Sequence, residues 1–260
     1  MDFNIEKKFD LNINDINDPI ILIGWPGIAL VAKLAISSIK DAIAAELFLD
    51  IEYFDFPPKS TVEDGILDIP TAKLYYKSRN DNDLFILTAN FQPQSPEGVF
   101  DFTRQFCEEM DKITGGKIKM YISTGALVSD KVSDNPKVHI CSTDRDLMNS
   151  FLELENTEIM SGGIIAGANG ILPAYAGVKG FAPGICLLAE TIPLPMMSLD
   201  PRASKALVKI LRDYFKIDMT FEELDKKIKE MQKVFDSFKQ QADWFMKDAK
   251  EDKGNDSYFR

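Results

Sequence analysis

The hydrophobic residues of this chain gather in short apolar runs that turns and helix-like segments separate. A run of four to eight apolar residues between turn residues is typical of a strand buried on both faces of a sheet. Strands are therefore predicted over residues 20–24, 84–89, 118–125, 138–141 and 185–189, and an alternating strand over 46–56. The stretches 66–70 and 72–78 are predicted to form a hairpin arm that closes at the polar turn 80–83.

Between these runs the apolar residues recur every three or four positions, which is the period of a helix. Ile28, Val31, Ala35 and Ile39 predict a helix over 28–45. Further helices are predicted over 96–113, 144–154 and 201–215, and proline is tolerated in the first turn of a helix. Strands that alternate with helices predict an α/β domain over residues 1–217, with a mixed, largely parallel sheet and helices on both faces.

Residues 218–249 carry a different pattern, predicted to be one long helix. Its apolar positions follow each other at alternating spacings of four and three: Leu224, Ile228, Met231, Phe235, Phe238, Ala242 and Phe245. This heptad repeat requires a partner helix or a groove, so it predicts oligomerisation or helix packing. A helix that lies flat on its own domain satisfies the same pattern, and both interpretations stay open.

The chain ends in two aromatic residues and a basic one, Tyr258, Phe259 and Arg260, after the polar stretch 250–257. Burial of one such ring contributes about 1.5–3 kcal/mol, so rings left in water forgo that gain. Residues 250–260 are therefore predicted to be a flexible tail whose last three residues either fold back or bind another molecule.

Charge and composition limit the partners. The formal net charge is −11, which argues against nucleic acid and anionic membranes, because both require basic surfaces. The uncharged stretch 159–178 is as long as a bilayer span, but five of its residues are glycines, so it is predicted to be a buried element of a core. The first residues lack a signal-peptide pattern, and the three separated cysteines indicate reduced thiols, so we expect a cytoplasmic protein.

The sequence offers little catalytic chemistry. His139 is the only histidine, and its place in an alternating strand favours a structural role. Carboxylates and cysteines do not cluster at metal-ligand spacing, so neither a metal nor a cofactor is predicted. An enzyme of this length usually shows one nucleophile or acid–base arrangement, so we expect a protein without enzymatic activity.

Two glycine-rich turns are the candidates for a ligand pocket. One follows the first buried strand and the other lies in 162–170; the residues concerned are Gly24, Trp25, Gly27, Gly163 and Gly167. Ligands of α/β proteins often bind beside such turns. The second turn lacks the Lys-Ser/Thr of a P-loop, and its glycines are also explained by close packing of a helix or loop over the sheet.

Several segments together resemble a known family. They are the residues Ile-Ile-Leu-Ile-Gly-Trp-Pro-Gly at 20–27, the strand at 83–87 with the loop at 92–93, 123–126, 163–167 and 186–191. They resemble the proteasome assembly chaperone family, in the branch related to the second eukaryotic assembly chaperone. The resemblance covers nearly the whole chain.

The resemblance implies an α/β fold similar to nucleoside phosphorylases but without an established catalytic set. Archaeal members are similar in their long C-terminal helix, in forming homo-oligomers and in a terminal hydrophobic-tyrosine-any tripeptide. That tripeptide inserts into pockets between proteasome α subunits. By position, Tyr258 is the hydrophobic residue, Phe259 the pocket aromatic and Arg260 the residue with the terminal carboxylate. Phe259 departs from the family's tyrosine and lacks its phenol hydroxyl.

The hypothesis from sequence is therefore a cytoplasmic, archaeal-type, homo-oligomeric assembly chaperone or adaptor that docks its tails on the proteasome α ring. A second hypothesis is an enzyme or binding protein for a nucleoside or small phosphorylated ligand, with its site at the two glycine-rich turns. A third is a multimeric interaction protein with another partner.

Overall fold

The computed structural model describes residues 3–130, 133–192, 198–234 and 236–237. The chain divides into two compact units, residues 1–219 and 220–260, and each is described by itself.

The first unit is built on a mixed β-sheet. Its described residues form a nine-stranded sheet in the order β1-β3-β6-β7-β2-β8-β11-β9-β10, and a separate two-stranded sheet, β4-β5. The strands are β1 (Phe3–Lys7), β2 (Ile20–Gly24), β3 (Glu46–Tyr53), β4 (Thr61–Glu63), β5 (Ile66–Asp68), β6 (Thr71–Lys77), β7 (Leu84–Ala89), β8 (Met120–Val128), β9 (Val138–Ser142), β10 (Thr157–Ile159) and β11 (Gly184–Thr191).

Parallel pairing is confined mainly to the centre of the large sheet. β2 pairs in parallel with β7 on one side and with β8 on the other, and β8 pairs in parallel with β11. The flank β1-β3-β6-β7 is antiparallel, as is the pair β9-β11. The central strands are apolar on both faces, and every residue of β2 and β7 is buried, as expected for strands covered on both sides. The predicted mixed α/β sheet is confirmed.

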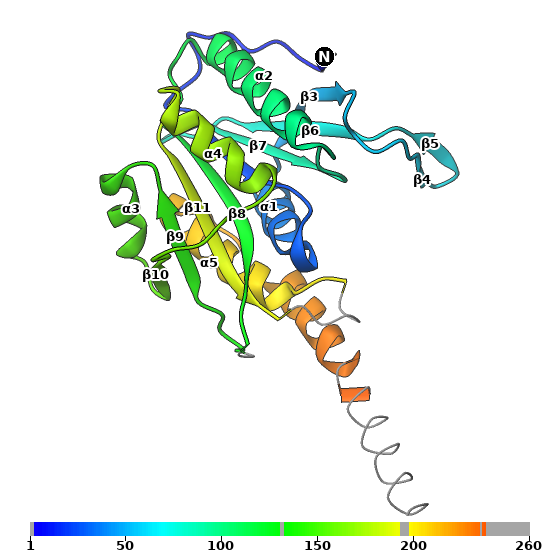
Figure 1. The fold of residues 1–260 in the computed structure, drawn as a ribbon, viewed down its shortest axis with the longest axis vertical. Coiled ribbons are helices and arrows are strands. Elements are labelled where there is room, and N and C mark those ends of the chain that lie inside the picture. The colour runs from blue at the N-terminus through cyan, green and yellow to red at the C-terminus, as the bar shows by residue number, and fades with distance from the viewer. Residues whose placement is uncertain (1–2, 131–132, 193–197, 235, 238–260) are drawn as a thin grey trace, which may run out of the picture. The chain divides into compact units, whose positions relative to one another are not determined.

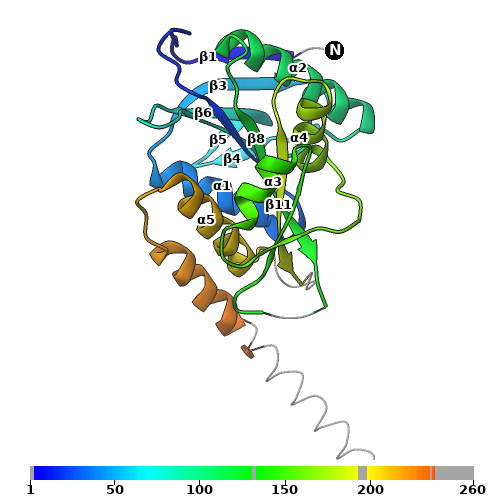
Figure 2. The ribbon, with the colours of Figure 1, turned by 90° about the vertical axis from the view of Figure 1, so that its left-hand side faces the viewer.

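Helices cover both faces of the sheet (Figures 1 and 2). They are α1 (Val31–Ala42), α2 (Pro96–Thr114), α3 (Arg145–Leu152), α4 (Ala168–Val178) and α5 (Pro201–Phe215), and a short 3₁₀ turn, η1 (Ile28–Leu30), precedes α1. α1 packs beside α5 on one face, and α2 beside α4 on the other. Both prolines predicted in first turns do begin helices, behind the capping residues Ser95 and Asp200.

The hydrophobic core between the sheet and α2 is rich in aromatic rings. Trp25 and Phe102 are both fully buried and meet edge to face, with ring centroids 5.2 Å apart. Phe102 also stacks on Phe106 one turn further along α2. Aromatic pairs of this kind contribute roughly 0.5–1.5 kcal/mol beyond their buried area. The turn that carries Trp25 is thus anchored in the core.

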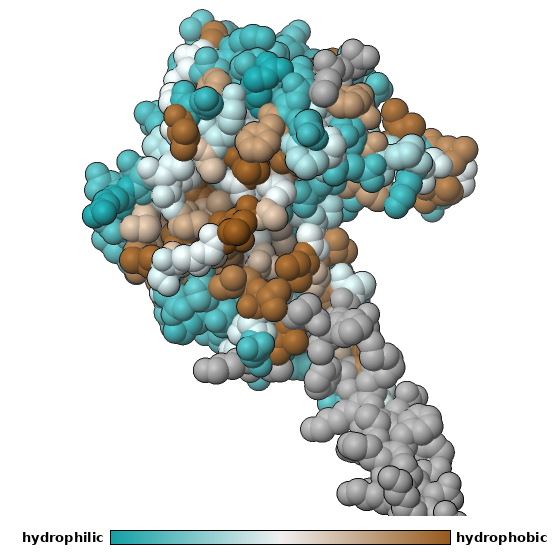
Figure 3. All heavy atoms as spheres, viewed as in Figure 1, coloured by the Kyte–Doolittle hydropathy of each residue, from teal (hydrophilic) through white to brown (hydrophobic). Residues whose placement is uncertain are grey.

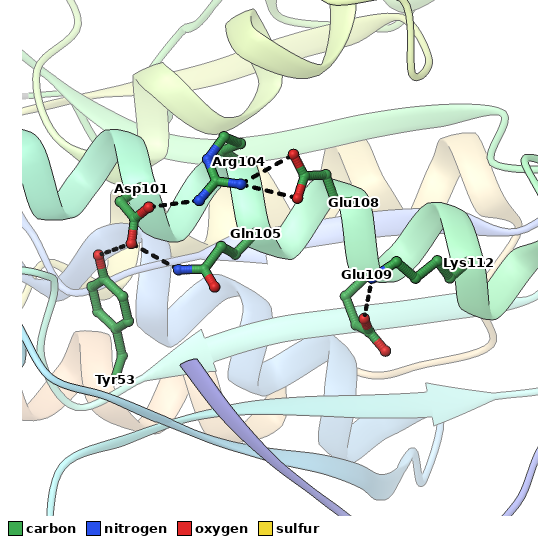
Figure 4. A network of polar contacts seen from close by, with 7 residues as sticks. All are labelled: Tyr53, Asp101, Arg104, Gln105, Glu108, Glu109 and Lys112. Atoms are coloured by element: carbon green, nitrogen blue, oxygen red, sulfur yellow. Dashed lines mark hydrogen bonds and ion pairs between the residues drawn. The ribbon is translucent and has the colours of Figure 1, made fainter. Parts of the chain in front are cut away.

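Polar contacts fix α2 to the sheet at its outer side (Figure 4). The Tyr53 hydroxyl at the end of β3 donates to Asp101 over 3.0 Å, and Arg104 donates to the same carboxylate over 2.8 Å. Burial raises the pKa of Asp101, but the hydrogen bonds from Arg104, Tyr53 and Gln105 outweigh it, so the net pKa is lowered. The network stabilises the helix position and lies on the surface, apart from any cavity described below.

Two local predictions need correction. The turn 80–83 does close a hairpin, but its strands are β6 and β7, while β5 pairs with β4 as a separate arm. The helix predicted over 28–45 begins at Val31, because Ala29 and Leu30 adopt left-handed backbone angles, and it ends at Ala42. A third prediction is confirmed: the glycine-rich stretch contains a helix, α4, that packs over β8 and β11 of the sheet.

The second unit is described as a helix over residues 222–234, with helical residues again at 236–237. Leu224, Ile228 and Met231 lie on this helix at spacings of four and three, so they share one side of it. The predicted helix over 218–249 thus begins at residue 222 rather than 218, while Phe235, Phe238, Phe245 and the other predicted positions beyond residue 237 lie outside the described residues. In the part of the chain that the structure describes, no helix is both long and apolar enough to cross a bilayer.

Candidate functional site

The turn between β2 and α1 lies at the carboxyl end of the central strand. Gly24 is required there, because a Cβ would come 2.5 Å from Ile36 Cγ1 and 2.7 Å from the Ala32 carbonyl oxygen. Ala29 and Leu30 follow with φ of 48° each, a conformation that non-glycine residues rarely adopt. The Asp200 amide donates to the Ala29 carbonyl over 2.8 Å and holds the turn in this shape. Such local strain is common at functional sites.

The side chain of Gln92 joins this turn to the start of α4. Its Nε2 donates to the Pro26 carbonyl over 2.5 Å, and its Oε1 accepts from the Ala168 amide over 2.9 Å. Gly167, with φ of 76°, lets Gln92 approach, since a Cβ there would lie 2.7 Å from Oε1. The first amide of α4 is therefore already occupied, and a phosphate has no free donor at that position.

Asn169 makes a second connection between the same segments. Its Oδ1 accepts from the Trp25 amide over 3.0 Å, and its Nδ2 donates to the Trp25 carbonyl over 3.4 Å. The Ser123 hydroxyl on β8 donates to the Asn169 carbonyl over 2.5 Å. Gln92 and Asn169 thus tie the β2–α1 turn, the β7–α2 loop and α4 together.

These segments enclose a pocket of about 300 Å³, which we call the apolar pocket. It lies beyond the carboxyl end of β2, against residues of β8 and β11, and ligands of parallel sheets often bind at the carboxyl ends of the strands. Its lining is mostly apolar: Gly27, Ile28, Ala32, Gln92, Gly125, Ala126, Leu127, Met160, Ile164, Ile165, Ala166, Asn169 and Leu188. Hydrophobic side chains also gather on the face of the unit drawn in Figure 3, and Ile164 is 95% exposed.

The structure brings the two predicted glycine-rich turns together at this pocket. Gly27 lines it, and Gly167 lies at the start of α4 directly after the lining residues 164–166. Gly24 and Trp25 lie beneath it, against α1 and in the core. Gly163 lies in the loop before α4 and does not line the pocket. That a ligand binds here stays a prediction.

The hydroxyls near the pocket are not arranged for nucleophilic chemistry. Ser123 and Thr124 are buried and donate to backbone carbonyls, Thr124 to Ile23 over 3.0 Å. His139 is held between two carboxylates on β10 and β11, with Nδ1 3.3 Å from Glu158 and Nε2 3.2 Å from Glu190. No histidine or other base therefore faces these hydroxyls among the pocket's lining residues.

The two buried thiols, Cys107 and Cys186, are also poor nucleophiles, whereas the hydrogen bond with Cys186 lowers the pKa of Cys141. Cys186 on β11 lies opposite Cys141 on β9 and donates to the Asn169 carbonyl over 3.6 Å. Its hydrogen bond with Cys141 and its burial raise the pKa of Cys186. Burial likewise raises the pKa of Cys107 to about 12. Among the described residues, no group of three or more His, Cys, Asp or Glu could hold a metal ion.

Sequence reasoning did not assign a role to Gln92 or Asn169. A single amide side chain in a loop carries no signal of its partners, which here lie 76 and 144 residues away. The predicted docking residues Tyr258, Phe259 and Arg260 lie outside the described residues.

A model of the PAC2 family matches residues 21–239. The chain belongs to the PAC2 family. The family resemblance seen in the sequence is therefore confirmed.

Several known proteins are similar to this chain in sequence or in fold. An uncharacterized protein from Methanocaldococcus jannaschii is 29% identical over 240 residues, which cover 92% of this chain and 90% of the relative. Among solved structures, PbaB of Pyrococcus furiosus, an archaeal proteasome activator, superposes with a TM-score of 0.81 at 23% identity, over 91% of this chain and 98% of PbaB. PbaA of the same organism, an archaeal homolog of proteasome-assembly chaperone, gives 0.69 at 20% identity, over 94% and 100% of the two chains. This chain thus has the fold of PbaA and PbaB.

Proposed function

We propose that this PAC2-family protein is an assembly chaperone or activator-type partner of the proteasome and performs no chemistry itself. The observation that supports it most is the family match over residues 21–239, together with the fold shared with PbaB, which is described as an archaeal proteasome activator. The protein acts in the cytoplasm as a homo-oligomer and docks the tails of its subunits into pockets of the α ring.

The tail residues have the chemistry for such docking. Tyr258 and Phe259 offer two aromatic rings to apolar pockets. A short peptide binds weakly alone but gains avidity when several copies sit on one oligomer. The heptad positions from Leu224 to Phe245 supply a surface for bringing the copies together.

The geometry of the apolar pocket does not favour the alternative of an enzyme for a phosphorylated ligand at that place. Its lining residues include no lysine, arginine or histidine, and the first amide of α4 is taken by Gln92. Phosphate recognition uses cationic side chains or free backbone amides. The tail hypothesis therefore stands ahead of it.

The decisive experiment compares pull-down of α-ring complexes by the full chain and by a chain that lacks residues 258–260. Removal of the tripeptide is expected to abolish capture. Phe259→Ala is expected to weaken it, and Phe259→Tyr to tighten it by about 0.5–1.5 kcal/mol if the restored hydroxyl finds a partner. Phe100→Ala removes another exposed ring, 53% accessible, and serves as the matched control with unchanged capture. Equal capture with and without the tripeptide would contradict tail docking.

A further inference from the structure

A second pocket lies on the α1 face of the sheet and differs from the first in chemistry. We call it the lysine pocket; its volume is about 230 Å³. α1, β5, β6 and the end of β7 enclose it, with the lining residues Lys33, Ser37, Lys40, Asp68, Ile69, Thr71, Lys73, Tyr75, Thr88, Ala89 and Asn90. Nothing in the proposed proteasome function uses it.

Its polar walls follow from the periods of the two elements that form them. Lys33, Ser37 and Lys40 are spaced four and three apart, so they share one side of α1. On β6, Thr71, Lys73 and Tyr75 alternate with buried apolar residues, so they share one face of the strand. Two regular elements therefore direct three ammonium groups and several hydroxyls at one cavity.

The lysines are incompletely neutralised. Lys33 Nζ lies 2.5 Å from the neutral Oδ1 of Asn90, and no ion pair of Lys33 is present among the described residues. Its burial lowers its pKa, which indicates a charge partly removed from water without a counter-ion. This arrangement is notable in a chain with 30 basic and 41 acidic residues.

The other two lysines have weak partners, and the carboxylates nearby are few. Lys40 Nζ lies 2.9 Å from the exposed Asp41 carboxylate and 4.8 Å from the centre of the Tyr75 ring. Lys73 Nζ lies 3.9 Å from Asp50 on the neighbouring strand β3. Ion pairs of exposed side chains contribute about 0–1 kcal/mol, so they compete weakly with a bound anion. Asp68 is the one carboxylate in the lining itself, on the exposed β4-β5 arm.

We propose that the lysine pocket binds a small anion that carries a phosphate or carboxylate group. The ammonium groups of Lys33 and Lys40 supply charge, and Ser37, Thr71 and the Asn90 amide supply neutral donors. The volume is below the roughly 300–1,000 Å³ that drug-sized ligands occupy, so the ligand is a small one. The site is independent of tail docking, because it lies wholly within the first unit.

Calorimetric titration of the full chain with inorganic phosphate, and separately with succinate, tests the site at constant ionic strength set with sodium chloride. At least one of the two probes is expected to bind, and Lys33→Gln or Lys40→Gln to weaken that binding about tenfold or more, as loss of a charge-assisted hydrogen bond implies. Lys209→Gln removes the same charge from an exposed position on α5 and is the matched control with unchanged affinity. Preference for phosphate or for succinate identifies the group that the site recognises.

Lysine acetylation followed by mass spectrometry gives a second measurement that needs no variant. The bound probe is expected to slow acetylation of Lys33 and Lys40 at least several-fold and to leave Lys209 unaffected. If neither probe binds above the chloride background, or if Lys33→Gln and Lys209→Gln change the affinity equally, the proposal is overturned.

Discussion

The apolar pocket and the lysine pocket flank the same helix start but have opposite chemistry. Ala32 lines the apolar pocket, and its neighbour Lys33 lines the lysine pocket, because successive residues of a helix point about 100° apart. Amide side chains clamp the walls of the apolar pocket, whereas the walls of the lysine pocket hold charges without strong partners. Neighbouring residues at the start of α1 thus line two pockets, one with a mostly apolar lining and one with three lysines in its lining.

Removal of the clamp at Asn169 is expected to have the largest effect. Asn169→Ala deletes both hydrogen bonds to Trp25 and leaves the buried backbone amide of Trp25 without a partner. The expected cost is about 3 kcal/mol in the free energy of unfolding. Chemical denaturation measures it. Asn149→Ala on the exposed surface of α3 is the control and is expected to change stability by no more than about 0.5 kcal/mol. Equal losses in the two variants would show that Asn169 is no clamp.

The two glycines of the β2–α1 turn provide a sharper test. Gly24→Ala forces a methyl group against Ile36 and the α1 backbone and is expected to cost about 2 kcal/mol, as overpacking does. Gly27→Ala meets only Asn169 Nδ2, at 3.9 Å, and its φ of −161° suits any residue. It should therefore change thermal stability little. If Gly27→Ala proved the more damaging, our account of the turn would be wrong.

In the lysine pocket the expected effects on stability are smaller. Lys73→Gln removes the cation nearest to Asp50, whose Oδ1 is buried without a hydrogen bond, and is expected to cost about 0.5–1 kcal/mol. The loss should shrink in high salt, which screens charge interactions. Denaturation of the wild type and the variant in low and high salt measures both effects. A stabilised variant would contradict the pairing.

Lys33→Gln is expected to have the smallest effect, with the opposite sign. Because burial lowers the pKa of Lys33 in the fold, its charge destabilises the native state at neutral pH. The variant is therefore expected to melt at the same temperature as the wild type or slightly above it. Any gain should vanish above pH 10.5, the ordinary pKa of a lysine, because Lys33 is then neutral in both the folded and the unfolded state. A clear loss of stability at pH 7 would contradict this view of Lys33.

Many of the strands and helices could be predicted from local sequence pattern. A buried strand such as Ile20–Gly24 is recognised by its continuous run of apolar residues. β1 was not predicted, since Phe3–Lys7 holds only two apolar residues, and its pairing with β3 is what identifies it as a strand. The start of α1 was misplaced because the left-handed angles at Ala29 and Leu30 depend on a tertiary contact with Asp200.

One of the two candidate pockets could be predicted from the sequence, and the other could not. The glycine-rich turns could be found from sequence because glycine marks tight turns and close packing, and they do meet at one pocket. The lysine pocket could not, because its lysines come from α1 and β6, and only the sheet order places them together. Lysines on a helix or strand otherwise indicate only a solvated surface.

The hydrogen bond from the Trp25 amide to the Asn169 side chain joins residues 144 positions apart in the chain. Contacts so distant cannot be made by a short local segment, because closing a loop of that length costs chain entropy. The apolar pocket is therefore a property of the folded first unit and not of any isolated segment. Any molecule that occupies it would bind the native state alone and raise the melting temperature with its concentration. Binding of a ligand to the apolar pocket would therefore measure the fraction of the protein that is folded.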